Sequence, residues 1–396
     1  MVGKLKVSFS WPRLAKASLV AGLAALTYWL YFWHLGRLVP GLSAAEIQTR
    51  AASHSLRAIF DSPLNGPYYA WERLWQAVGH GHASYLRLGG SLIALGLVYC
   101  FFSLCRRWLG AFMAALASLA FASLPWLVLS ARTASADIMW LSPLVLAYLY
   151  NLVITAKNRI GLKLGLLALA AAVVLYTPGL IWFALLGAIF AAKPLWQKFR
   201  QLGWAAQSLI SLIFLATLAP LARGLVIHHV DLRSWLLIPH PWFSPLVSLK
   251  GIAWALLMLI WRAPTHLPII LGRLPILSAG LIVLMGLGLV NLYRHYSRWL
   301  VVAGLSWTGL VTILAGINQA WPLVGSLAPF CLLAGAFGLD YLYKEWRSIF
   351  PRNPLAKATA LVLIFMLIGA QLTYALRYSL VAWPHSPLTR AAYVLK

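Results

Sequence analysis

The stretch SYLRLGGSLIALGLVYCFFSLCRRWLGAFMAALASLAFASLPWLVLS, residues 84–130, holds two long apolar runs on either side of a short basic segment. A run of about 20 apolar residues crosses the hydrocarbon core of a bilayer as an α-helix. Similar runs recur along the whole chain, which is 62% hydrophobic and only 10% charged. They lack the alternation of polar and apolar residues that membrane β-strands require. The sequence therefore predicts an all-α polytopic membrane protein.

We predict about eleven membrane-spanning helices that form a single transmembrane domain over residues 1–396. The signal Thr177-Pro178-Gly179 divides the long apolar run 163–192 into two helices. The apolar stretch 251–261 is short and rich in Trp, so it is predicted to lie in the interface rather than to span the membrane. The predicted spans are 14–33, 84–104, 111–130, 137–155, two within 163–192, 203–222, 268–292, 299–316, 321–342 and 358–376.

The distribution of charge gives the expected orientation. The basic N-terminus is assigned to the cytoplasm, which implies a multi-pass protein of the cell (inner or plasma) membrane. The parity of the spans then places two long loops, 34–83 and 223–267, and the tail 377–396 on the outer face. The net charge of +25 lies in short loops at span ends. That pattern is typical of membrane topology and excludes nucleic acid as a partner.

Lysine and arginine differ in where this topology places them. Most lysines fall on the cytoplasmic side, whereas more than half of the arginines fall on the outer side. Arginine forks match phosphate oxygens in two-point contacts, so an outer arginine-rich surface suits a lipid phosphate. Contact with lipid headgroups is the alternative explanation. Cys100, Cys105 and Cys331 have no metal-site or disulfide spacing. We expect neither a metal nor a cofactor.

The first outer loop holds Glu46, Asp61 and Glu72, three of only seven acidic residues. The segment from Ser43 to Glu46 fits a capping box, which would make Glu46 a helix cap. From Glu46 onward, Arg50, His54, Arg57 and Asp61 follow at helical spacing and predict one polar stripe on a single helix. Such a stripe is either a solvated face or a site. Glu46 is therefore a cap or a catalytic base, kept ionised by Arg50 one turn away.

A second candidate pair, Arg132 and Asp137, lies in a very short outer loop. Asp137 opens a helix, where a carboxylate gains from the helix dipole. An ionisable pair this close to the hydrocarbon is more often functional than a surface pair, and Arg132 is expected to contact Asp137 or a substrate phosphate. The remaining binding candidates are His82 and Arg87 before the second span, Arg233 in the second outer loop, and Asn318 and Gln319 in the last one. Each of these also has a simple structural explanation, such as a helix cap or a headgroup contact.

Several stretches together resemble a known family. They are PLNGPYYAWERLWQAVG from Pro63, RRWLGAFMAALASLAFASLPWLVLSARTASADI from Arg106, and WPLVGSLAPFCLLAGAFGLDYL from Trp321. Their order is similar to the membrane core of lipid-linked glycosyltransferases of the protein-mannosyltransferase and aminoarabinose-transferase type, which have the C-type glycosyltransferase fold.

The resemblance implies roles for individual residues. Glu46 matches the acid that acts as base in the first outer loop of the family, and Arg132 and Asp137 match its R-x-x-x-x-D motif. Tyr68 and Tyr69 match its Pro-Tyr-Tyr stretch. The chain departs from the family at Ala45, where many members carry a second acid, and a soluble C-terminal domain is not expected.

The family resemblance implies an inverting transfer of a sugar from a polyprenyl-phosphate donor to a lipid, glycan or protein acceptor on the outer face. Glu46 would take the acceptor proton, and outer arginines would stabilise the leaving phosphate. The expected partners are therefore this donor, the acceptor and membrane lipids. A lipid or polysaccharide transporter and an inactive family member that binds lipid-linked sugar are the alternatives. The sequence shows neither an internal repeat nor an acid at mid-membrane depth to favour a transporter.

Overall fold

The computed structural model describes residue 22 and residues 25–80, 82–227, 231–240, 242–296 and 298–394. Much of the first predicted span therefore lies outside the described residues. Within these ranges the regular elements are helices, and no strand is formed. The prediction of an all-α membrane protein is confirmed.

The quoted stretch that begins at Ser84 folds into helix α5, Ala83–Ala122, which bends back on itself at Gly110. Gly110 has a φ of 76°, in the left-handed region that glycine adopts without steric cost. The break falls just after the basic pair Arg106 and Arg107, so α5 contains the two antiparallel spans that the sequence predicts. Helix α6, Pro125–Arg132, follows after a turn at Ser123 and Leu124.

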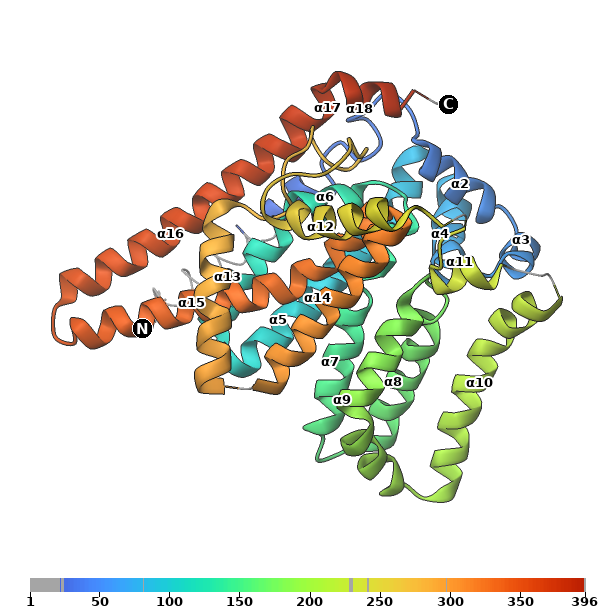
Figure 1. The fold of residues 1–396 in the computed structure, drawn as a ribbon, viewed down its shortest axis with the longest axis horizontal. Helices are drawn as coiled ribbons and strands as arrows, with labels where there is room; N and C mark the ends of the chain where they lie inside the picture. The colour runs from blue at the N-terminus through green and yellow to red at the C-terminus, as the bar shows by residue number, and fades with distance from the viewer. Residues whose placement is uncertain are drawn as a thin grey trace, which may run out of the picture.

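Four helices form one part of the bundle, seen at the lower right in Figure 1. They are α7 (Pro143–Ile154), α8 (Ile160–Val174), α9 (Leu180–Arg200) and α10 (Trp204–Ile227). Between α8 and α9 the chain turns at Gly179, whose φ is 78°. The predicted division of the run 163–192 is confirmed.

The rest of the bundle is formed by helices that follow in the sequence. They are α12 (Pro245–Ile260), α13 (Ala279–Asn291), α14 (Arg298–Asn318), η3 (Trp321–Leu327), α15 (Ala328–Ile349) and α16 (Pro354–Leu376). Helices α13 and α15 touch through glycine. A Cβ on Gly288 would lie 1.6 Å from the Ala334 carbonyl oxygen, and one on Gly338 would lie 2.0 Å from that of Leu284. Small residues that bring backbones together are typical of membrane helix packing.

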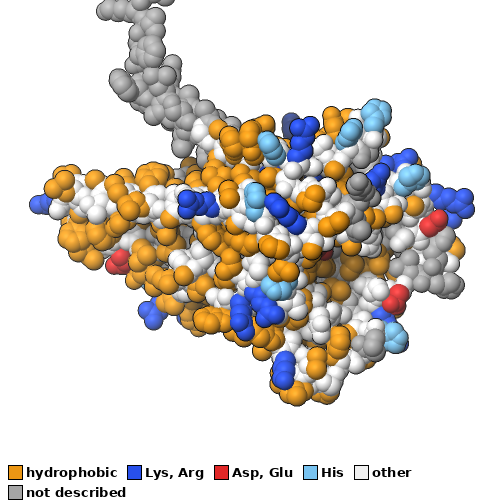
Figure 2. Space-filling model, turned by 90° about the horizontal axis from the view of Figure 1, so that it is seen from above, with side chains coloured by type: hydrophobic (Ala, Val, Ile, Leu, Met, Phe, Trp, Pro, Cys, Tyr) orange, Lys and Arg blue, Asp and Glu red, His pale blue; other side chains and the backbone are white. Residues whose placement is uncertain are grey.

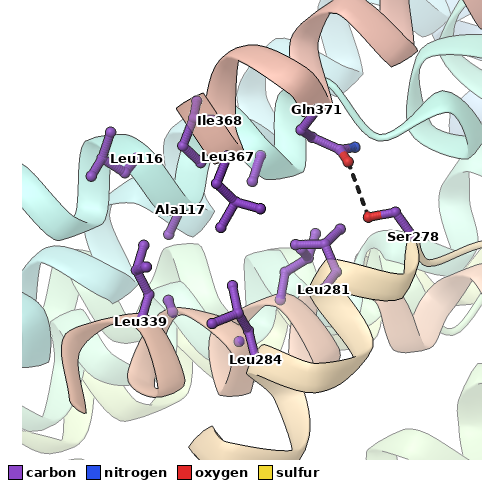
Figure 3. A pocket seen from close by; sticks show the side chains of 13 residues that line it. Leu116, Ala117, Ser278, Leu281, Leu284, Leu339, Leu367, Ile368 and Gln371 are labelled. Carbon is purple, nitrogen blue, oxygen red and sulfur yellow. Dashed lines mark hydrogen bonds between the residues drawn. The ribbon is translucent and has the colours of Figure 1, made fainter. Parts of the chain in front are cut away.

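Helix α16 lies against α5, α13 and α15 around a small cavity of about 40 Å³ (Figure 3). Leucines from α13, α15 and α16 point into it, together with Leu116 and Ala117 of α5. At its edge the Ser278 hydroxyl lies 3.2 Å from Oε1 of Gln371 and donates a hydrogen bond to it. This contact anchors the C-terminal part of the chain to the bundle.

Seven described helices or helix pairs have the length and apolar composition to cross a membrane. They are Ala83–Ala122, Ala136–Ile154, Leu180–Arg200, Trp204–Ile227, Arg298–Asn318, Trp321–Ile349 and Pro354–His385. Helix α5 holds two predicted spans, whereas α8 and α13 are shorter than a full crossing. The predicted number of eleven spans stays a prediction.

Short helices gather at one end of the bundle, at the top of Figure 1. They are α2 (Ala44–Ala52), α3 (Leu56–Asp61), α4 (Gly66–Gly79), α11 (Leu232–Leu236), α17 (Trp383–His385) and α18 (Pro387–Ala392). Helix α12 lies across the same end. Seen from above, basic and histidine side chains are scattered among hydrophobic ones, and acidic side chains are few (Figure 2). The two predicted outer loops and the C-terminal tail thus meet at one end of the molecule.

Candidate active site

The centre of this end is a buried ion pair between Glu46 at the start of α2 and Arg87 near the start of α5. The distance from Arg87 Nε to Glu46 Oε1 is 2.6 Å, and that from Nη2 to Oε2 is 3.1 Å. Glu46 is 0% exposed and Arg87 is 2% exposed. Such a two-point contact is the strongest geometry that an arginine and a carboxylate can form.

The Glu46 carboxylate has two further hydrogen-bonding partners, both on the main chain. The Ser43 amide donates to Oε2 at 2.8 Å, and the Ala134 amide donates to Oε1 at 3.3 Å. The Ser43 hydroxyl accepts from the Glu46 amide, which completes the predicted capping box. A carboxylate has about four lone-pair positions, and here each oxygen accepts two hydrogen bonds. Glu46 therefore ties α2, α5 and the segment after α6 together.

The predicted polar stripe from Glu46 to Asp61 is wrong. The chain leaves the helix at Ser53, and a new helix begins after Ser55, whose hydroxyl accepts from the Ala58 amide at 3.1 Å. Because the helix is interrupted, the polar residues from Glu46 to Asp61 do not share one helical face. Arg50 is exposed, and Arg87 rather than Arg50 is the partner of Glu46. Farther along, Arg57 and Asp61 form the expected pair one turn apart, at 3.8 Å, but on the surface.

Arg132 does not pair with Asp137, which corrects that part of the prediction. Its guanidinium is 3% exposed and donates to the main-chain carbonyls of Leu30, at 2.8 Å, and Trp33. In the part of the chain that the structure describes, Arg132 has no acidic partner. Burial, and after it the positive charge of Arg87, lower the pKa of the Arg132 guanidinium to about 10. Arg132 stays charged at neutral pH, so the site holds a positive charge that no acid compensates.

Asp137 lies five residues farther on, in the first turn of the short helix η1, Ala136–Leu141. Its amide donates to the Ser135 hydroxyl at 3.3 Å, so the turn holds its backbone in place. Unlike Glu46, Asp137 is only half-buried as a residue. Burial of its carboxyl group raises the pKa of Asp137, and the Ser135 hydroxyl partly offsets that rise. Burial also raises the pKa of the neighbouring Tyr69 hydroxyl, and the Asp137 carboxylate adds to that rise. Asp137 is thus a half-buried carboxyl group with a raised pKa beside a neutral phenol.

Helix α4 brings Tyr68, Tyr69 and Glu72 to the same region. Tyr68 is 1% exposed and Glu72 is 0% exposed. Among the described residues no group forms a hydrogen bond of good geometry with the Glu72 carboxyl oxygens, although the Tyr68 hydroxyl is close enough to offset part of the rise in the pKa of Glu72. The carboxyl group fits against α5 only because residue 89 is glycine: a Cβ there would lie 2.4 Å from Glu72 Oε1. Burial raises the pKa of Glu72 to about 8, so this carboxyl group is largely protonated at neutral pH.

The C-terminal tail covers the ion pair. Helices α17 and α18 lie at the site end of the bundle, and the ring of Tyr393 stands 6.0 Å from Cζ of Arg87. Tyr393 is 1% exposed and packs edge-on against Trp383, whose indole nitrogen donates to the Pro268 carbonyl at 2.8 Å. The tail, predicted only to lie outside, is a wall of the site.

The remaining predicted binding residues are not assembled with this cluster. His82 is exposed at the start of α5, and Arg233 is exposed with Nη1 2.8 Å from Nδ1 of His240. The Asn318 amide donates to the carbonyls of Leu237 and Leu314, at 2.7 and 2.9 Å, and thereby joins two helices. Gln319 is exposed, in a left-handed conformation with a φ of 53°. No group of three potential metal ligands occurs within the described ranges.

An apolar cavity of about 340 Å³ lies below the cluster. Tyr68 and Trp71 of α4 form part of its wall, and Ile138, the residue after Asp137, forms another part. The rest of the wall comes from α5, α7 and α8. Asp137 thus directly precedes a residue that borders a space lined by hydrocarbon.

Two solved structures share this arrangement of helices, and both are ArnT from Cupriavidus metallidurans. The one bound to undecaprenyl phosphate matches with a TM-score of 0.56 and 14% sequence identity, over 95% of this chain and 76% of that one. The apo structure matches with a TM-score of 0.57 and 14% identity, over 96% of this chain and 76% of that one. The chain has the ArnT fold. No protein-family model and no curated protein matches the sequence.

The ArnT fold confirms the fold that the sequence resemblance implies. A fold fixes where loops and helices lie, whereas an activity depends on the residues placed in the site. Two of those residues, Glu72 and Tyr393, were not among the predicted ones. Glu72 was visible as one of three acids in the first outer loop, but its burial depends on Gly89 in another helix. Nothing in the sequence near Tyr393 links it to Arg87.

Glu72 gives a prediction on stability. Between about pH 4.5 and 8 the folded chain keeps this carboxyl group protonated while the unfolded chain ionises it, so stability falls as the pH rises. Glu72→Gln lacks this titration. The melting temperature of the purified variant minus that of the parent should therefore increase from pH 5 to pH 8. A constant difference across this range would show that Glu72 ionises normally in the folded protein.

Proposed function

We propose that this protein is a glycosyltransferase that moves a sugar from a polyprenyl-phosphate carrier to an acceptor at the outer face of the membrane. One observation carries the proposal. Asp137, a half-buried carboxyl group, directly precedes Ile138 in the wall of an apolar cavity, and Arg132, a buried cation that donates to neutral carbonyl groups, lies five residues earlier in the sequence. A polyprenyl-phosphate sugar has a part for each of these features: a phosphate for the cation, a sugar for the carboxyl group and a hydrocarbon chain for the cavity. One of the ArnT structures is bound to undecaprenyl phosphate.

Arg132 provides the electrostatic part of donor binding. Its charge is held by neutral carbonyl groups, whereas the charge of Arg87 is balanced by Glu46. A fixed positive charge of this kind favours an anion in its neighbourhood and stabilises the negative charge that grows on a leaving phosphate. We propose that the phosphate lies near Arg132, and that the exposed Arg50 and Arg233 contact parts of the donor or lipid headgroups outside the buried cluster. The prenyl units nearest the phosphate would occupy the 340 Å³ cavity.

The acceptor proton goes to Asp137 in this proposal. The acceptor hydroxyl or amine attacks C1 of the sugar, the bond from C1 to the phosphate oxygen breaks, and Asp137 takes the proton. Attack from the side opposite the phosphate inverts the configuration at C1. Tyr68 and Tyr69, whose raised pKa values keep both hydroxyls neutral at pH 7, are proposed to hydrogen-bond sugar hydroxyls. The remaining candidates for sugar or headgroup contacts are His82, Asn318 and Gln319.

Glu46 is assigned a positioning role. It was predicted to be the base, but the carboxylate is fully buried and its hydrogen-bonding positions are filled by Arg87, Ser43 and Ala134. To accept a proton from an acceptor it would have to give up at least one of these bonds. Through Ala134 it instead holds the segment that leads to Asp137. In this proposal both carboxylates belong to the site, and Asp137 is the less buried of the two residues.

Arg132→Lys tests the electrostatic part of the proposal. Lysine keeps the charge but cannot reach two carbonyl groups with a planar fork, so the cation loses its fixed place. We expect the affinity for a polyprenyl phosphate to fall about tenfold, a typical cost for losing one charged hydrogen bond. Titration of the purified protein with undecaprenyl phosphate measures this. An unchanged affinity would remove Arg132 from the donor site.

A deletion strain tests the function as a whole. Mass spectrometry of cell-envelope lipids and glycans should show one sugar missing from one component, and the parent gene should restore it. A gene encoding Asp137→Asn should fail to restore it although the protein accumulates in the membrane. An inactive sugar-lipid-binding protein would leave the envelope sugars unchanged or would be fully replaced by the Asn variant, and either result would contradict the proposal.

A further inference from the structure

A second and larger cavity, of about 440 Å³, lies between α5, α7, α9, α14 and α15. Its walls are formed mainly by large apolar side chains such as Phe101, Leu144, Phe183, Trp307 and Leu333. It is separate from the cavity beside Tyr68. Ser142 and Val145 of α7 border that cavity, whereas Leu144, Ala147 and Asn151 on another face of α7 border this one.

The charged side chain in the wall of the large cavity, Arg107, lies at the end farthest from the candidate active site. Arg107 lines it, together with Tyr150 and Asn151. Arg107 follows Arg87 by twenty residues on the first span of α5, a distance of about 30 Å along a helix and the thickness of the hydrocarbon core. The chain turns back at Gly110 immediately afterwards. Arg107 therefore lies at the membrane surface opposite the site.

The length of the cavity fits a lipid that belongs to that surface. Its lining runs from Leu141 at the end of η1 to Ile154 at the end of α7, about 20 Å of helix. This is somewhat more than the ~15 Å that one leaflet contributes to a ~30 Å hydrocarbon core. An acyl chain entering beside Arg107 would have apolar walls along its whole length.

The charge at the entrance identifies the headgroup chemistry. The Arg107 side chain is exposed, and in the described part of the chain no acidic side chain forms an ion pair with it. A guanidinium fork at the end of an apolar space matches a phosphodiester at the end of an acyl chain. Tyr150 and Asn151 add neutral hydrogen-bonding groups beside it. We propose that this cavity is a binding site for a membrane phospholipid, with its phosphate at Arg107 and one acyl chain between α7 and α14.

The sugar donor is a poor match for this cavity. Its phosphate has to lie at the site end, about 30 Å from Arg107. The proposal therefore does not rest on the proposed transfer reaction, and a failure of either leaves the other standing. Because α7 follows directly on the segment that carries Asp137, a lipid here would also brace the helix below the site.

A pair of adjacent arginines provides the test. Arg107 lines the cavity, whereas its exposed neighbour Arg106 does not. The purified protein is freed of lipid in detergent, and its binding of dioleoyl phosphatidylglycerol is measured by native mass spectrometry. We expect Arg107→Ala to weaken binding about tenfold, whereas Arg106→Ala should match the parent. Equal effects of the two substitutions would overturn the assignment of the phosphate to Arg107.

A second variant tests the acyl-chain part of the site. Ala303→Trp places a large ring in the cavity wall and should lower phosphatidylglycerol binding about tenfold. Dioleoylglycerol, which lacks the phosphate, should bind at least tenfold more weakly than phosphatidylglycerol. Unchanged binding by a folded Ala303→Trp protein, equal binding of dioleoylglycerol, or displacement of the phospholipid by one equivalent of undecaprenyl phosphate would each contradict the proposal.

Discussion

Asp137→Asn is expected to lower the kcat of sugar transfer by about a hundred- to ten-thousand-fold, the range that a general base contributes. Asparagine has nearly the same size and keeps the backbone turn at Ser135, so folding should be preserved. What it loses is the ability to take the acceptor proton. Initial rates with a saturating donor measure the effect.

Asp231→Asn is the control for this variant, because Asp231 is an exposed acid before α11 whose hydrogen bonds, among the described residues, stay within its own turn. It should keep a rate close to that of the parent. A rate for Asp137→Asn within about threefold of the parent would remove Asp137 as the base.

Arg87→Ala is expected to produce the largest loss of stability. It leaves the Glu46 carboxylate buried without its cation, and breaking a buried ion pair in this way costs about 3–5 kcal/mol. It also removes the support for Tyr393, so the C-terminal tail should detach at lower temperature. Thermal unfolding in detergent measures both effects.

The exposed Arg50, on the same helix as Glu46, provides the control. Arg50→Ala should change the stability by no more than about 0.5 kcal/mol, the usual range for a surface substitution. If Arg87→Ala and Arg50→Ala unfold at the same temperature, the ion pair does not hold the site together.

Glu46→Gln separates the two roles of that residue. The base predicted from the sequence would make this variant as inactive as Asp137→Asn. If Glu46 has a positioning role, we expect a smaller loss of rate together with a loss of stability. Arg87, Ser43 and Ala134 donate to two carboxylate oxygens in the parent protein, whereas glutamine offers them one oxygen. A Glu46→Gln protein that is stable but wholly inactive would restore Glu46 as the base.

The helices were predictable because their signals are local. Apolar runs gave the spans, Gly179 gave the turn within 163–192, and the spacing from Ser43 to Glu46 gave the capping box. The break between α2 and α3 was missed although its signal is also local. Ser53 and Ser55 cap the two helix ends there, and serine is a cap former that a count of helical spacing overlooks.

Most residues of the candidate site could be predicted from the sequence, whereas most of the contacts between them could not. Glu46, Arg87, Arg132 and Asp137 were all identified as candidates, but Arg50 was the wrong partner for Glu46, and Asp137 is not the partner of Arg132. Glu46 finds its cation on another helix, and Arg132 bonds to the carbonyls of the segment before the first outer loop. Such contacts depend on how helices pack, which neither spacing nor composition contains. The cover formed by Tyr393 is hidden for the same reason.

A single-turnover assay shows whether sugar leaves a polyprenyl phosphate on this protein. The purified parent protein, in excess, is mixed with a polyprenyl-phosphate sugar that carries radiolabel in the sugar, together with an envelope lipid extract as acceptor source. We expect the label to move to a new product while an equal amount of polyprenyl phosphate is released, and we expect Asp137→Asn to bind the same donor without converting it. If the parent protein binds the donor and leaves it intact, with every envelope fraction and sugar tested, the protein is not a transferase of this kind.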